Sequence, residues 1–200
     1  MAVVKNMIQL PECITIEQRK EWSEVIWGFE IKNFYEVLDQ SGKSLLHILE
    51  TGNSGTRRAW KNHAIRPFEF QIHDPISKEH LLTMKAPVRL FWYSINILSP
   101  DSTPILSVTR KLSFLGRVFK LEGKINGSIK GFWFFWKYKI FLDTNNNCLM
   151  VRKWNGIFKV FLFGASKFKL QFYKNTTDYN KVLLLASAFL PEMLYHDTNN

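Results

Sequence analysis

Cysteine is nearly absent from this chain of 200 residues, which carries only Cys13 and Cys148, far apart in sequence. A disulfide framework would need more cysteines, so the sequence favours two free thiols in a reducing compartment. The opening residues, MAVVKNMIQLPE, lack a basic segment followed by a long apolar stretch, and we therefore expect no secretory signal. These absences predict an intracellular protein.

The chain also lacks an apolar run long enough for a transmembrane helix, which needs roughly 20 residues. Val182 to Leu190 is a run of nine residues without a charge, and Pro191 should stop or kink a helix there. Thr177 and Asp178 stand ahead of the run as helix N-caps. Because a helix that is apolar on every face must be enclosed, the sequence predicts a buried core helix from Asn180 to about Leu190.

Acidic residues are scarce in the second half of the chain. Between Asp101 and Asn175 there are fourteen Lys and Arg but only three acids, an excess of eleven positive charges, whereas the remainder is close to neutral. This asymmetry indicates an anionic partner, either phospholipid headgroups or nucleic acid. A basic face that only improves solubility is the alternative.

What the sequence does contain is alternation of apolar and polar residues, together with many aromatics. Many short strands with turns every eight to twelve residues are typical of a sandwich or barrel. No linker or repeat is visible, which favours one domain over residues 1–200, expected to be monomeric. The predicted strands include 13–16, 35–38, 45–49, 68–72, 81–84, 88–97, 105–110, 117–121, 128–129, 133–142, 148–153, 158–163 and 168–173.

The basic residues of the late strands share one parity. Lys137 and Lys139 alternate with large apolar residues, and Lys167 and Lys169 do the same. This pattern predicts a closed sheet with an apolar lumen, filled by the C-terminal helix, and a cationic exterior. Trp133 and Phe135 have the parity of Lys137, so we expect them outside as a peripheral membrane contact, with a purely structural role as the alternative.

Several short motifs resemble the phospholipid scramblase family. They are GFEIKNFYEV from Gly28 with Ser41-Gly42 and Glu50, Arg66-Pro67-Phe68 with Asp74, and Trp154-Asn155-Gly156 followed by Phe168, Leu170, Gln171 and Phe172. The resemblance covers about residues 27–197. It implies the Tubby-like fold, a closed twelve-stranded antiparallel barrel around a hydrophobic C-terminal helix, and a function in lipid movement between leaflets.

The chain departs from that family where calcium and acyl groups would be held. The positions of the family's calcium-binding aspartates hold Gly164, Ser166 and Asn175, and the cysteine-rich run falls on Arg89 to Tyr93, which has no Cys. His63, His73, His80 and Asp74 match no standard metal-site spacing. We therefore expect no cofactor and no metal.

No arrangement of nucleophile, base and acid typical of catalysis is present, so we expect a non-enzymatic protein. The sequence predicts a scramblase-like protein that is cytoplasmic or peripheral at the membrane. We expect it to contact anionic lipid without calcium, and we further expect it to move phospholipid between leaflets. A nucleic-acid-binding barrel and a ligand-carrying or structural barrel remain as alternatives. The candidate lipid-binding residues are Lys137, Lys139, Lys167, Lys169, Arg152, Lys153, Trp133 and Phe135.

Overall fold

The computed structural model describes residues 9–19, 33–51, 67–87, 93–114, 116–131, 137–143, 147–152 and 167–195. These residues form twelve strands and one helix. The elements are β1 (Cys13–Arg19), β2 (Phe34–Leu38), β3 (Ser44–Glu50), β4 (Phe68–His73), β5 (His80–Ala86), β6 (Ser94–Leu98), β7 (Pro104–Lys111), β8 (Arg117–Gly123), β9 (Gly127–Gly131), β10 (Lys137–Leu142), β11 (Asn147–Arg152), β12 (Lys167–Phe172) and α3 (Asp178–Tyr195).

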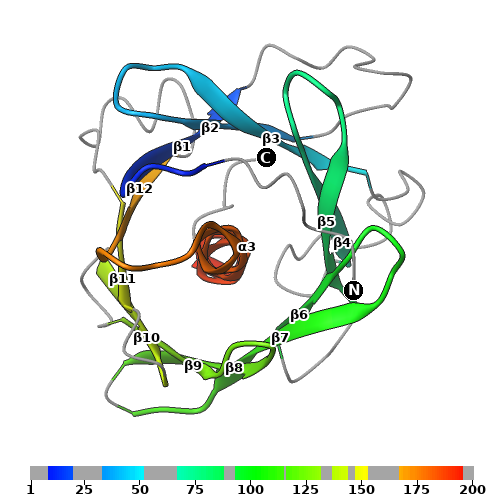
Figure 1. Ribbon diagram of the computed structural model, residues 1–200. Helices are drawn as coiled ribbons and strands as arrows, with labels where there is room; N and C mark the ends of the chain where they lie inside the picture. The colour runs from blue at the N-terminus through cyan, green and yellow to red at the C-terminus, as the bar shows by residue number, and fades with distance from the viewer. Residues whose placement is uncertain are drawn as a thin grey trace.

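The strands form a closed antiparallel barrel in which each strand pairs with its neighbours in sequence. Closure comes from β1 and β12, which pair antiparallel with Ile14 opposite Leu170. Figure 1 looks down the barrel and shows the strands as a ring around α3. The predicted closed barrel of about twelve strands is confirmed.

Alternating burial along each late strand explains why these residues form a barrel wall. In β10, the exposed Lys137 and Lys139 alternate with the buried Tyr138 and Ile140. Side chains of a strand point alternately to its two faces, so the apolar set turns inward and the lysines turn outward. The predicted division into an apolar lumen and a polar exterior therefore holds.

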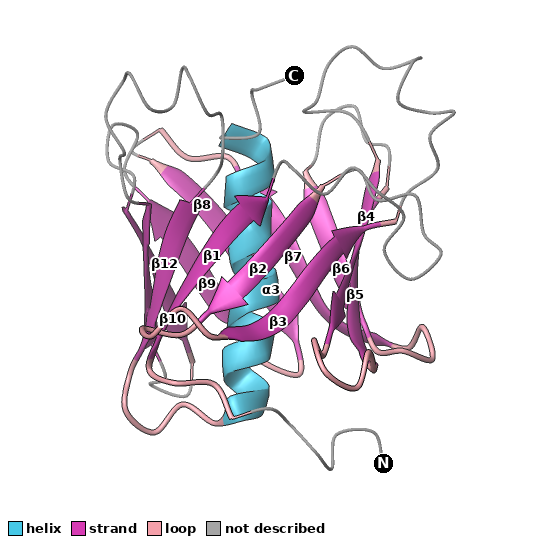
Figure 2. Cartoon of the chain, turned by 90° about the horizontal axis from the view of Figure 1, so that it is seen from above, coloured by secondary structure: helices cyan, strands magenta, loops and turns pink. Residues whose placement is uncertain are grey.

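The helix α3 runs along the barrel axis (Figure 2), and the strands surround it in the view down the barrel (Figure 1). Residues 182–191 are all buried. Thr177 caps its start, because the Asn180 amide donates to Thr177 Oγ1 at 3.3 Å. The one polar side chain in that buried run, Ser187, donates to the Leu183 carbonyl at 2.7 Å, so its hydroxyl is satisfied inside the lumen. The prediction of a buried core helix is confirmed.

The helix extends further than predicted. The sequence predicts an end near Leu190, but Pro191 lies inside the helix, which ends at Tyr195. A proline removes one backbone hydrogen bond and usually ends or kinks a helix. Here Leu190 is 1% exposed and Pro191 is buried as well. Packing of this segment within the barrel therefore outweighs the lost hydrogen bond.

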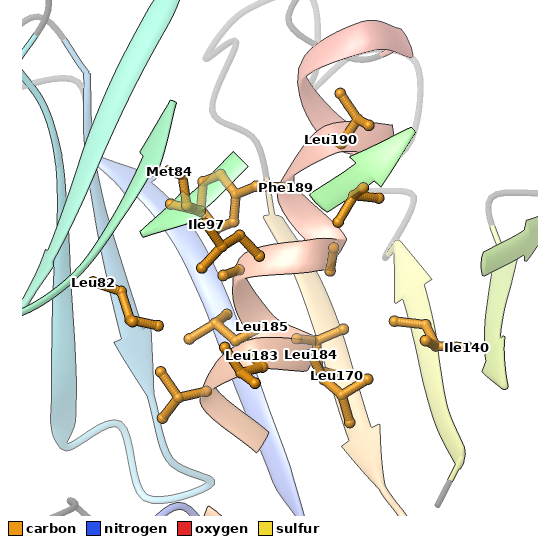
Figure 3. Close-up of a cluster of buried hydrophobic side chains, with 14 of the residues drawn as sticks. Leu82, Met84, Ile97, Ile140, Leu170, Leu183, Leu184, Leu185, Phe189 and Leu190 are labelled. Atoms are coloured by element: carbon orange, nitrogen blue, oxygen red, sulfur yellow. The ribbon is translucent and has the colours of Figure 1, made fainter. Parts of the chain in front are cut away.

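The side chains of α3 project toward several strands at once (Figure 3). Leu183, Leu184, Leu185 and Phe189 belong to one apolar cluster with strand residues such as Leu170. At the start of the helix, Lys181 Nζ donates to the Leu10 carbonyl, and the Leu10 amide donates to Asp178 Oδ1 at 3.3 Å. The segment before β1 and the first turn of α3 therefore hold each other in place.

Some predicted strands differ from the observed ones in their bounds. The strand predicted over 88–97 is observed as Ser94–Leu98, and the one predicted over 133–142 is observed as Lys137–Leu142. Residues 88–92 and 132–136 lie outside the described residues, as does the strand predicted over 158–163.

Candidate membrane-binding surface

Four lysines on the outside of the late strands form the main candidate surface, which we call the cationic wall. Its members are Lys130 of β9, Lys137 and Lys139 of β10, and Lys169 of β12, all of them exposed. None of the four forms an ion pair with an acid in the part of the chain that the structure describes. Their charges are therefore available to an external anion.

The strand register places these like charges close together. Lys130 and Lys139 are direct partners across β9 and β10. Lys137 and Lys169 are both opposite Val151 of β11, one from each side, and two strand spacings separate them by about 10 Å. Like charges directly opposite each other destabilise a sheet. The wall thus carries a cost in stability that a bound anion would relieve.

An outward aromatic residue lies within the wall. Phe141 of β10 is 39% exposed, and Lys130 Nζ lies 5.5 Å from the centre of its ring. A cation over an aromatic face is an attractive arrangement worth about 0.5–1 kcal/mol at exposed sites. The pair presents an apolar ring and a positive charge on the same patch of surface.

The other predicted site residues are not among the four lysines of the cationic wall. Lys167 forms an ion pair with Glu17 of β1, so its charge is already compensated. Arg152 is the last residue of β11 and lies opposite Phe168 in the register. Lys153, Trp133 and Phe135 lie outside the described residues, and the predicted outward placement of the two aromatics stays a prediction.

Sequence reasoning missed Lys130 and Phe141 as members of the wall. Phe141 has the parity of Lys137 and Lys139, and that signal alone places it outside. Lys130 lies in a five-residue strand with glycines at both ends, so it gave little alternation from which to infer a face. Its position opposite Lys139 follows only from strand pairing.

The early strands differ from the cationic wall because their basic residues form ion pairs with nearby acids. Arg19 of β1 contacts Glu36 at 2.7 Å and Glu17 at 3.6 Å. Lys85 of β5 contacts Glu69 of β4 at 3.2 Å. These pairs leave little net charge on the early half of the barrel.

Two histidines on these early strands add no charge at neutral pH. Burial lowers the pKa of His47, although the nearby Glu36 acts in the opposite direction. Burial likewise lowers the pKa of His73. Both imidazoles are therefore neutral at pH 7, and the positive excess of the barrel lies on its late strands.

The described residues hold no candidate metal site, and one of the two thiols is buried. No group of three or more His, Cys, Asp and Glu side chains there could hold a metal ion. His73 and His80 stack with their ring centres 5.2 Å apart, while His63 lies outside the described residues. Cys148 is buried, and burial raises the pKa of its thiol to about 12, so it stays protonated and unreactive.

These features define a class: a closed twelve-stranded barrel around a central helix, with an uncompensated cationic face on its late strands. The chain belongs to the Scramblase family, which matches residues 2–198. It is also similar to human phospholipid scramblase 4, with 20% identity over 214 residues that include 97% of this chain. The chain spans 64% of the length of that relative. No solved structure matches the chain.

Within the described residues, we find no helix with the length and apolar character that crossing a membrane requires. The helix α3 has 18 residues and lies within the barrel (Figures 1 and 2).

Proposed function

We propose that this protein binds anionic phospholipid surfaces through the cationic wall and acts on lipid as a scramblase-like, non-enzymatic protein. One observation carries the proposal. Lys130, Lys137, Lys139 and Lys169 are exposed on adjoining late strands without an acidic partner among the described residues, although Lys130 directly faces Lys139. Membership of the Scramblase family supports lipid rather than nucleic acid as the anion.

The physical basis of this binding is electrostatic attraction to a negatively charged leaflet. Each Lys or Arg near an anionic membrane surface contributes about 1 kcal/mol, and the effect falls off within a Debye length of about 8 Å at physiological salt. Four lysines on one curved wall can approach a flat membrane together only if the wall faces it. Binding should therefore weaken as salt is raised.

The test reverses three wall lysines. The variant Lys137→Glu/Lys139→Glu/Lys169→Glu is expected to bind vesicles of phosphatidylcholine and phosphatidylserine at least about 100-fold more weakly, because about 1 kcal/mol is lost at each site. Co-sedimentation at several vesicle concentrations measures the affinity. Circular dichroism should show an unchanged fold, because all three side chains are exposed.

The matched control reverses Lys43, Lys78 and Lys124, which are exposed in turns between strands. This variant has the same net charge as the wall variant but keeps the wall intact, and we expect less than about a threefold loss of affinity. Equal losses from the two variants would show that attraction is diffuse. A wall variant that releases an oligonucleotide but keeps vesicle binding would favour nucleic acid as the partner.

We further propose that lipid binding by this chain needs no calcium. A calcium site takes about six to eight oxygen ligands, usually with several carboxylates. The sequence from Phe163 to Lys167 contains no carboxylate, and the ammonium group of Lys167 is paired with Glu17. Vesicle binding and melting temperature are expected to be the same with micromolar calcium and with chelator. A rise in either on adding calcium would contradict the proposal and point to ligands elsewhere in the chain.

A further inference from the structure

The connection between β7 and β8 exposes two large apolar side chains, which we call the apolar tip. Leu112 is 83% exposed and Phe114 is 103% exposed. Single exposed apolar residues are normal on protein surfaces. Two of them within one short connection, next to the exposed Lys111, combine apolar surface with positive charge. That combination is typical of segments that enter a membrane interface.

The apolar tip lies at one rim of the barrel. Because neighbouring strands are antiparallel, the odd-numbered strands all finish at the same rim, and α3, which follows β12, also finishes there. We call this the upper rim, and it is at the top of Figure 2. Lys111 ends β7 and Lys137 begins β10, so both lie at the upper rim, and Lys130 is one residue from the end of β9.

The opposite rim, which we call the lower rim, carries acidic turns. Each of four connections at this rim contains an aspartate, and these are Asp39, Asp74, Asp101 and Asp143. The side-chain hydrogen bond from Ser41 lowers the pKa of Asp39, and those from Ser99 and Thr103 lower the pKa of Asp101. Asp39 and Asp101 are therefore ionised at neutral pH. The lower rim therefore carries both signs of charge, since Lys43, Lys78 and Lys124 lie in its connections beside these aspartates, whereas the cationic wall lies nearer the upper rim.

Acidic residues are also absent from the sequence around the apolar tip. Residues 102–121 contain no Asp or Glu but four basic residues, namely Arg110, Lys111, Arg117 and Lys120. Lys120 is paired with Glu122 at 2.6 Å. Lys111 is exposed and forms no ion pair with a described residue, although the hydrogen bond from Lys120 and, more weakly, the charge of Lys111 lower the pKa of the Glu122 carboxyl. An anionic bilayer matches both the apolar and the positive part of this surface.

We propose that the barrel tilts on the membrane so that the cationic wall faces the lipid with its upper end closest, and that Leu112 and Phe114 insert into the interface, with Lys111 at the level of the anionic headgroups. The proposal rests on the proposed function, anionic membrane binding, and adds to it an orientation and an inserted segment. Burial of apolar side chains is not screened by salt, unlike the attraction of the lysines. The tip should therefore supply the part of the binding that survives raised salt.

The first experiment removes the apolar side chains without changing charge. The variant Leu112→Ser/Phe114→Ser is expected to bind phosphatidylcholine vesicles containing phosphatidylserine about tenfold more weakly at raised salt. The matched control is Ile76→Ser/Tyr173→Ser, which removes two apolar side chains that are 86% and 55% exposed at the lower rim. The control should bind as the unmodified protein does, and both variants should keep its melting temperature.

The second experiment reads insertion directly. An environment-sensitive fluorophore is attached at Phe114→Cys, or at Ile76→Cys as the control, in a Cys13→Ser background that leaves only the buried Cys148. On adding the same vesicles, the label at position 114 is expected to shift to the blue and to be quenched by brominated lipid. The label at position 76 should change little.

The outcomes separate this inference from the proposed function. Failure of the unmodified protein to bind these vesicles would overturn both. Binding that is unaffected by Leu112→Ser/Phe114→Ser, with no shift of the label at position 114, would overturn the inference and leave the proposed function standing. Concentration-dependent self-association that this variant abolishes, again with no vesicle-induced shift of the label, would also overturn it, because the apolar tip would then contact a second copy of the chain.

Discussion

Replacing Leu184 with Asp is expected to unfold the protein. Leu184 is completely buried in α3, and Figure 3 shows it within the cluster of apolar side chains between the helix and the barrel wall. An isolated carboxylate in such a site must either stay charged without a partner or take up a proton, and both cost several kcal/mol. Since single domains are stable by only about 5–15 kcal/mol, the loss should abolish the cooperative melting transition in circular dichroism.

The control for this prediction adds the same charge to the same helix. Asn180→Asp lies in the first turn, is only partly buried, and places a negative charge near the helix N-terminus, where it is favourable. We expect its melting temperature to equal or slightly exceed that of the unmodified protein. A Leu184→Asp variant that stays soluble and melts normally would show that the helix packs outside the barrel.

Truncating Phe189 to Ala is expected to lower the free energy of unfolding by about 3–5 kcal/mol. The Phe189 ring contacts aromatic rings from three strands, with centre-to-centre distances of 5.3 Å to Tyr35, 5.8 Å to Phe70 and 5.8 Å to Phe168. Those strands, β2, β4 and β12, lie on both sides of the closing strand β1. Truncation would leave a cavity where the helix supports this part of the wall.

Urea unfolding followed by circular dichroism measures this change. Phe141→Ala serves as the control, because it removes the same atoms from a side chain that is 39% exposed on the outer face of β10. We expect a loss of at most about 1 kcal/mol there, since little buried surface is removed. If the two truncations cost the same, Phe189 does not occupy a close-packed interior position.

Parts of the candidate surface could be predicted because parity along a strand is a local property. Lys137, Lys139 and Lys169 were assigned to the outer face from their alternation with apolar residues, and all three are exposed. Their proposed role in binding lipid stays a prediction. The predicted end of α3 near Leu190 was wrong, because the effect of Pro191 depends on the packing around it as well as on the backbone.

Which lysines keep an uncompensated charge could not be predicted, because this depends on residues distant in sequence. Lys167 and Lys169 look equivalent in the sequence, yet Lys167 is opposite Glu17, which is 150 residues away, and Lys169 is opposite Thr15. The facing pair of Lys130 and Lys139 likewise requires the observed register of β9 and β10.

The sequence by itself determined the closed apolar interior, the helix that fills it and the outward face of the late strands. Alternation with a period of two and an all-apolar helical segment each dictate burial through local geometry. Only the tertiary structure decided which charges are compensated and which side chains share a rim. Antiparallel pairing brings β1 beside β12 and turns the β7–β8 connection, with Leu112 and Phe114, toward the rim where Lys137 begins β10. That arrangement depends on which strands pair and in what register, and no local pattern encodes either.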